Sequence, residues 1–100
     1  MKYLGNAFSL QMITGDCNIS VREIASSDVP ADVQSVIGHQ DTASVASSIL
    51  GFEVPANRVS VSLKADDELY VVQVVGGRLP EGSTTLPEGF ALKWMKVTIL

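Results

Sequence analysis

The stretch that decides the fold is Leu69-Tyr70-Val71-Val72-Gln73-Val74-Val75. It is a continuous run of mostly apolar and β-branched residues, which is typical of a strand buried on both faces. A turn signal, Asp66-Asp67, stands shortly before it, and Gly76-Gly77 directly follows it. We therefore expect this stretch to form the central strand of a sheet, covered on both sides.

Four further strands are expected around it. They lie at residues 2–8, 18–25, 59–64 and 92–100. In the last of them Met95, Val97 and Ile99 share one face. Residues 76–90 hold four Gly and two Pro and are expected to form a loop.

Two helices are expected between the second and third of these strands. Pro30 suits the first turn of a helix with Val33, Val36 and Ile37 on its apolar face, and Gly38 would end it in a left-handed conformation. Asp41 suits the N-cap of a second helix, which Gly51 would end. The apolar face of that second helix would be Val45, Ala46, Ile49 and Leu50. The expected fold is α/β, one domain over residues 1–100, with a mixed sheet of about five strands flanked by helices.

Composition excludes several classes of function. The net charge is −4 with only seven Lys and Arg, so long DNA or RNA is not an expected partner, whereas a small anionic ligand needs only a few cations. No apolar run approaches the roughly 18 residues that span a bilayer, so we expect no membrane partner. Cys17 is the single cysteine, which favours a reducing compartment and a cytoplasmic protein. One Cys and one His cannot build a structural zinc site, and we expect no metal and no other cofactor.

His39 is the single histidine of the chain, and histidine is the residue type that serves most often as an acid or base near neutral pH. A lone histidine is more often a surface or capping residue than a catalytic one. Here, however, Gly38 would present the ring outward, and a helix begins just after it, whose free N–H groups attract anions. An imidazole beside an anion site is what phosphate-ester chemistry uses.

Three other clusters are candidates for binding. Arg78 and Glu81 follow the central strand, either as an exposed ion pair in a flexible loop or as part of a binding loop. Asn6, Ser9 and Gln11 stand where the first strand ends, which suits either turn chemistry or a ligand. Asp66-Asp67-Glu68 is expected to be a solvated tip and not a metal site.

Three segments taken in order resemble the viral ring nucleases, a family of small anti-CRISPR proteins. They are Tyr3-Leu4-Gly5-Asn6-Ala7-Phe8-Ser9, Ser35-Val36-Ile37-Gly38-His39, and Asn57-Arg58-Val59 with Leu69-Tyr70-Val71-Val72-Gln73. The resemblance covers nearly the whole chain, with Arg78 and Glu81 three apart after the central strand.

The resemblance implies a homodimer that binds cyclic tetra-adenylate, the messenger of type III CRISPR systems, across its two-fold axis. The family cuts this ring without metal into linear di-adenylates, which suppresses the host defence. His39 takes the position of the catalytic histidine, Glu81 that of a supporting acid and Arg78 that of a ligand-gripping arginine. Asn6, Ser9, Thr42, Arg58 and Gln73 match further ligand-side positions.

Two alternatives to a ring-cleaving enzyme remain open. The first is a non-catalytic module of the same fold, which sequesters a cyclic nucleotide or binds a host protein. The second is a structural viral protein without a ligand.

Overall fold

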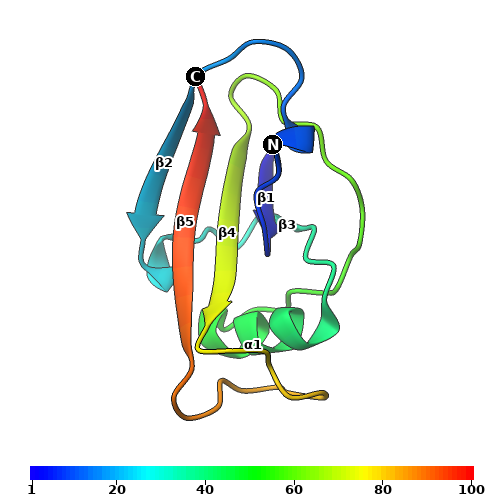
Figure 1. The fold of residues 1–100 in the computed structure, drawn as a ribbon, viewed down its shortest axis with the longest axis vertical. Coiled ribbons are helices and arrows are strands. Elements are labelled where there is room, and N and C mark those ends of the chain that lie inside the picture. The colour runs from blue at the N-terminus through cyan, green and yellow to red at the C-terminus, as the bar shows by residue number, and fades with distance from the viewer.

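The computed structural model describes residues 1–100 and contains a five-stranded mixed sheet. Its strands are β1 (Lys2–Gly5), β2 (Ile19–Ile24), β3 (Gln34–Ser35), β4 (Glu68–Val75) and β5 (Ala91–Ile99). Across the sheet they follow the order β2-β5-β4-β1-β3 (Figure 1). β1 runs parallel to β3 and β4, while β5 runs antiparallel to β4 and β2. The expected α/β fold with a mixed sheet of five strands is confirmed.

β4 is the middle strand, as the sequence predicts, and it is buried on both faces over residues 69–72, whereas Gln73 and Val75 near its end are exposed. Tyr70 and Val72 pack into a first core, to which Leu4, Trp94 and the helix also contribute. Leu69 and Val71 point the other way, into a second core with Val97 and Ile99 of β5. A segment buried on both sides gains nothing from a polar face, which explains why residues 69–72 do not alternate with charged or amide side chains.

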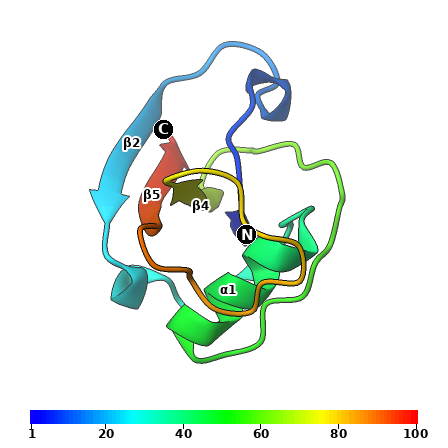
Figure 2. The same ribbon diagram turned by 60° about the horizontal axis from the view of Figure 1, so that its bottom comes forward.

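The single α-helix, α1 (Gln40–Leu50), lies across the end of the sheet at which β4 finishes (Figures 1 and 2). Its N-cap is His39 and not Asp41, which sits in the first turn, so that part of the prediction is wrong by two residues. Gly51 ends the helix at φ 79°, as expected. Ile49, expected on the buried face, is 41% exposed, because that face is formed by smaller residues such as Ala43 and Ala46.

The predicted helix over residues 30–37 is wrong. Gln34 and Ser35 instead form β3, which pairs with Tyr3 and Leu4 of β1. Val36 continues this contact, because its amide donates to the Leu4 carbonyl at 2.8 Å. The N–H and C=O groups at the edge of β1 need hydrogen-bond partners, and residues 34–36 supply them. These tertiary hydrogen bonds outweigh a helical pattern that only three apolar residues support.

The predicted strand over residues 59–64 is also wrong. Only Leu63 makes a bridge, to Ile13, and its amide donates to the Met12 carbonyl at 2.7 Å. Leu63 is buried in the second core, whereas Val59 is 50% exposed. The alternating pattern therefore marks an extended segment that covers the sheet. The first strand is likewise shorter than expected, ending at Gly5 and not at residue 8.

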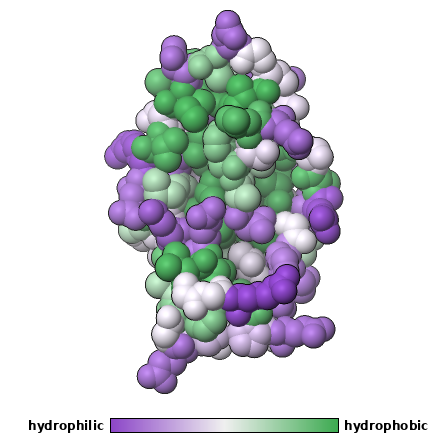
Figure 3. All heavy atoms as spheres, viewed as in Figure 1, coloured by the Kyte–Doolittle hydropathy of each residue, from purple (hydrophilic) through white to green (hydrophobic).

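We call the side of the sheet that holds the second core its second face. Residues of the segments 8–13 and 61–63 cover its β1–β4 side. The β2 side stays open, and Ile19 and Val21 are 39% and 52% exposed. Figure 3 shows apolar side chains gathered over the upper parts of β2, β5 and β4.

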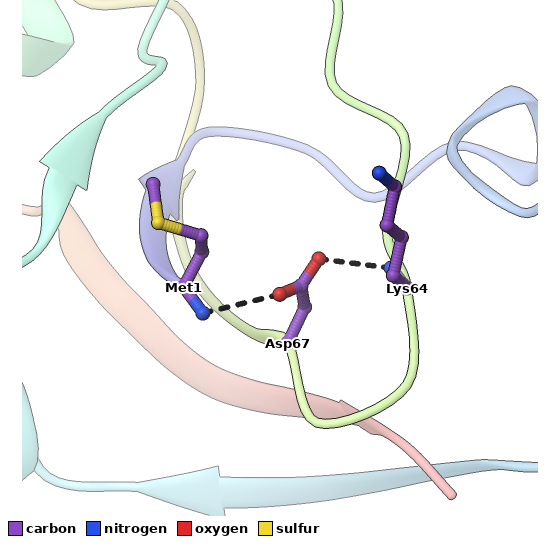
Figure 4. A network of polar contacts seen from close by, with 3 residues as sticks. All are labelled: Met1, Lys64 and Asp67. Atoms are coloured by element: carbon purple, nitrogen blue, oxygen red, sulfur yellow. Dashed lines mark hydrogen bonds and ion pairs between the residues drawn. The ribbon is translucent and has the colours of Figure 1, made fainter.

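Asp67 is buried at the turn before β4 (Figure 4). One carboxylate oxygen accepts from the Met1 ammonium at 3.1 Å and the other from the Lys64 amide at 2.8 Å. Burial acts to raise the pKa of Asp67, but these hydrogen bonds and the nearby positive charges outweigh it and hold that pKa below its ordinary value. Asp67 is thus a structural anchor and not part of a solvated tip.

Glu68, the next residue, pairs with Lys96 of β5. The ammonium lies 2.6 Å from the Glu68 Oε1 atom and 5.6 Å from the centre of the Tyr70 ring. The hydrogen bond to Glu68 raises the pKa of Lys96, although burial opposes it. This pair joins the two central antiparallel strands, so the acidic run at 66–68 serves the fold.

Candidate functional site

Most of the residues predicted for the site gather where β1 and β4 end and α1 begins. Ligands of α/β proteins bind at this carboxyl edge of parallel strands. Three adjoining hollows lie here, of about 340, 570 and 390 Å³. We name them after one lining residue each: the Arg58 hollow, the Glu81 hollow and the Gln73 hollow.

His39 lines both the Arg58 hollow and the Glu81 hollow. Its carbonyl accepts the first hydrogen bond of α1, from the Ala43 amide at 3.0 Å, but its side chain makes no capping hydrogen bond. The ring is exposed and is not used by the fold. His39 is therefore an exposed residue at the N-cap position of α1, as the alternative of a surface or capping histidine expects, but its side chain does not cap the helix.

Arg58 is brought to His39 by a clamp between two distant segments, residues 35–37 and 55–57. The Asn57 amide donates to the Ile37 carbonyl at 2.7 Å, and its side-chain nitrogen to the Ser35 carbonyl at 2.9 Å. The Ser35 hydroxyl in turn donates to the Pro55 carbonyl at 2.6 Å. These bonds fix the backbone on which Arg58 stands. The sequence reasoning did not assign this role to Asn57 or Ser35, since only the tertiary pairing reveals it.

Gly38 has a different role from the one expected. Its φ is not positive, so it does not end a helix in a left-handed conformation. Instead the stem of Arg58 packs against it, and a Cβ at position 38 would lie 3.2 Å from the Arg58 Cγ. Glycine is needed here for close approach, next to the proposed catalytic histidine.

The charges of the two hollows beside His39 differ. Arg58 is the one Lys, Arg, Asp or Glu side chain that lines the Arg58 hollow, and Asn6 adds an amide there. The Glu81 hollow carries two carboxylates, Asp41 and Glu81, against the single cation Arg78. A phosphate is favoured where cations are not offset by acids, so the Arg58 side is the better place for it.

The loop between β4 and β5 brings Arg78 and Glu81 to the second of these hollows. Gly76 and Gly77 begin it at φ 114° and 135°, a region that L side chains avoid. Glu81 lines the same hollow as His39, but neither a hydrogen bond nor an ion pair joins the two side chains. The loop thus brings an acid and a guanidinium to the far side of the imidazole.

The sequence and the fold both resemble those of known proteins. A model of the STIV B116-like family matches residues 2–92. The chain belongs to the STIV B116-like family. Among solved structures it is similar to B116 of Sulfolobus turreted icosahedral virus, with 21% sequence identity and a TM-score of 0.80 over 97% of each chain. At that identity the likeness shows the fold alone. The comparison with curated proteins gave no match.

The other predicted ligand-side residues of this B116-like chain divide into two groups. Asn6, Thr42 and Gln73 line the Gln73 hollow together, and Asn6 also reaches the Arg58 hollow. Ser9 and Gln11 do not line any of the three. Ser9 caps the short 3-10 helix η1 (Leu10–Met12) by accepting from the Gln11 amide at 3.3 Å, which is the turn chemistry that its sequence position also allows.

Metal binding and membrane crossing are two further properties that the structure bears on. No three His, Cys, Asp or Glu side chains lie close enough together to hold a metal ion. None of the helices has the length and apolar content that crossing a membrane requires.

Proposed function

We propose that this B116-like chain is a metal-independent phosphodiesterase that opens cyclic tetra-adenylate into linear di-adenylates and so suppresses type III CRISPR signalling in the cytoplasm of an infected cell. The observation that supports it most is the place of His39, between a hollow with an unopposed Arg58 and one with Glu81. The resemblance of the ordered segments to the viral ring nucleases supplies the substrate.

The chemistry needs no nucleophile from the protein. A ribose 2′-hydroxyl loses its proton to water and attacks its own 3′-phosphate, the bond from phosphorus to the 5′-oxygen breaks, and a 2′,3′-cyclic phosphate forms. His39 as imidazolium donates a proton to the leaving 5′-oxygen, and such assistance contributes roughly 10²–10⁴-fold. Arg58 and Asn6 hold the phosphate so that the 2′-hydroxyl, the phosphorus and the leaving 5′-oxygen lie in line. Such positioning strongly accelerates an intramolecular attack. Arg78 offsets the charge that grows on the phosphate, and Glu81 orients the imidazole.

Two copies of the chain are part of the proposal. Each copy supplies one histidine, so a two-fold dimer has two, and these cut two equivalent bonds of a four-nucleotide ring. The second face of the sheet is the surface we assign to the partner copy. Ile19 and Val21 form an open apolar strip on this face, and Gln73 of β4 is exposed on the same face, two residues beyond the buried Val71. A partner packed on this strip would bring its own Gln73 toward the same ligand.

The test is to incubate the pure protein with radiolabelled cyclic tetra-adenylate and separate the products. The wild type should give linear di-adenylate, and the same assay with a six-membered ring measures size preference. His39→Ala should abolish cleavage and keep binding, whereas Arg78→Ala should weaken both. EDTA should leave the rate unchanged. Tight binding without any product would favour the sequestering alternative.

The dimer has a separate test. Val21→Glu places a charge on the open strip, so the variant should run as a monomer in light scattering and lose cleavage while its melting temperature stays close to that of the wild type. Glu23→Gln, on the same strand and face, is the matched control and should remain dimeric. A monomeric variant that still cleaves at the wild-type rate would contradict the shared site.

A further inference from the structure

The loop that carries Glu81 is tied to α1 at two points. The Gly82 amide donates to the Asp41 Oδ1 atom at 3.1 Å, and the Ser48 hydroxyl donates to the Thr84 carbonyl at 2.6 Å. Figure 2 shows the loop between β4 and β5 running along the helix. The first of these bonds joins the residue after Glu81 to the first turn of the helix that begins just after His39.

The loop forms a tight turn at this point. The Pro80 carbonyl accepts from the Ser83 amide at 3.1 Å and from its hydroxyl at 2.6 Å, and Gly82 has φ +80°. A four-residue turn with a positive φ at its third position is of type II, and the turn itself does not use the amide of that third residue. That amide is the group that Asp41 holds. The contact therefore fixes the peptide unit that directly follows Glu81.

The Asp41 carboxylate is free for this contact. The helix takes His39 as its N-cap, so Asp41 does not cap it, and no ion pair joins Asp41 to Arg78 in the hollow that both line. A hydrogen bond from an amide to a carboxylate is stronger than one between neutral groups, so the Asp41 contact is the stronger of the two between the loop and α1.

We infer that Asp41 is a positioning residue, which holds the loop so that Glu81 stands opposite His39 across their shared hollow. This inference rests on the proposed function, because it assigns Glu81 the task of supporting His39. Asp41 itself need not touch the substrate. It acts by joining two segments about 40 residues apart in the chain.

The rival explanation is that an acid in the first turn of α1 stabilises the helix through its dipole. The two explanations predict different results for a variant that loses the charge of Asp41 but keeps a hydrogen-bond acceptor. Asp41→Asn keeps an oxygen that accepts from Gly82 but loses the charge, whereas Asp41→Ala loses both. A positioning role predicts that Asn rescues, and a dipole role predicts that Asn and Ala are alike.

The experiment measures kcat, KM and amide hydrogen exchange at Gly82 in wild type, Asp41→Ala and Asp41→Asn, with Asp16→Ala as the control for loss of an exposed acid outside the site. Asp41→Ala should lower kcat about 10- to 100-fold, the range of a misplaced catalytic group, with a smaller change in KM. Its Gly82 amide should exchange faster, and Asp41→Asn and Asp16→Ala should stay close to the wild type in both measurements.

The inference is overturned if Asp41→Ala keeps both kcat and Gly82 protection, or if Asp41→Asn loses as much as Asp41→Ala. A wild type that does not cleave the ring refutes the proposed function instead, and the exchange at Gly82 still tests the anchor. If Asp41→Ala does not fold, rapid exchange at Gly82 in the wild-type protein would overturn the anchor by itself.

Discussion

Replacing Gly38 with Ala would test how closely Arg58 is held beside His39. A Cβ at position 38 would lie 3.2 Å from the Cγ, 3.5 Å from the Cβ and 3.6 Å from the Cδ of Arg58. Because the φ of Gly38 is not positive, alanine fits the backbone without strain. The substitution therefore acts on the arginine stem and on little else.

The size of the effect follows from these distances. The nearest contact would be about 0.2 Å inside ordinary van der Waals distance, so the flexible arginine stem moves and the backbone stays. A charge-assisted hydrogen bond to phosphate contributes about 1.5–3 kcal/mol. Losing roughly 1–2 kcal/mol of it corresponds to about 5- to 30-fold weaker binding. Folding stability should instead hold or rise by about 0.4–1 kcal/mol, since alanine restricts the unfolded chain.

The assay is calorimetric binding of a 2′-deoxy cyclic tetra-adenylate, which lacks the attacking hydroxyl and cannot be cut. Gly38→Ala, Arg58→Ala and the double variant form a cycle, with urea unfolding run in parallel. In the Arg58→Ala background the Gly38 substitution should have no further effect. The reasoning is refuted if Gly38→Ala weakens binding by the same factor in both backgrounds, or if it destabilises the fold as it weakens binding.

Three further predictions concern the scaffold. Asp67→Asn should lower the free energy of unfolding by about 1.5–3 kcal/mol at pH 7, the range for hydrogen bonds to charged groups. Because the pKa of Asp67 is lowered in the folded state, this deficit should persist above pH 3.8 and shrink as the pH falls further, as urea unfolding at pH 7 and pH 3 would show. Lys96→Met should cost about 1 kcal/mol or less, because the side chains of the pair are still 27% and 23% exposed, and since the pKa of Lys96 is raised, that cost should be present below pH 10.5 and fade above it. Gly76→Ala would place a Cβ 2.8 Å from the Gly89 carbonyl oxygen, so it should cost about 1–3 kcal/mol and displace the loop that carries Glu81. Gly15→Ala is its control, with a φ of 77° but open space around it, and an equal loss in both variants would show that the clash does not matter.

Elements defined by local chemistry could be predicted from the sequence. Residues 69–72 are apolar on both sides of the pleat, and the structure buries them on both sides, although Gln73 and Val75 at the end of the run are exposed. Gly51 ends α1 in the left-handed conformation that glycine favours. Each of these features depends on residues within one turn or one strand.

Features that depend on distant partners could not be predicted in the same way. Val33, Val36 and Ile37 fit a helical spacing, but β1 has a free edge that takes the residues between them as β3. The same limit applies to the site. His39, Arg78 and Glu81 could be picked out by residue type and setting, and Arg58 by the resemblance, whereas the Ser35–Pro55–Asn57 clamp and the Asp41–Gly82 bond join segments about 20 and 40 residues apart. Nothing in the local sequence of either partner specifies the other.

The acidic net charge and the proposed anionic ligand are compatible because of where the ion pairs lie. Lys2 and Lys96 are paired with Asp32 and Glu68, and the Asp67 carboxylate is paired with the Met1 ammonium. Arg58 and Arg78 have no carboxylate within ion-pair distance, and both line hollows that His39 shares. The charge available to a ligand is set by these unpaired guanidinium groups and not by the total of −4. Arg58 stands with no acid in its hollow, so it should contribute more to binding, while Arg78, between Asp41 and Glu81, should contribute more to the rate.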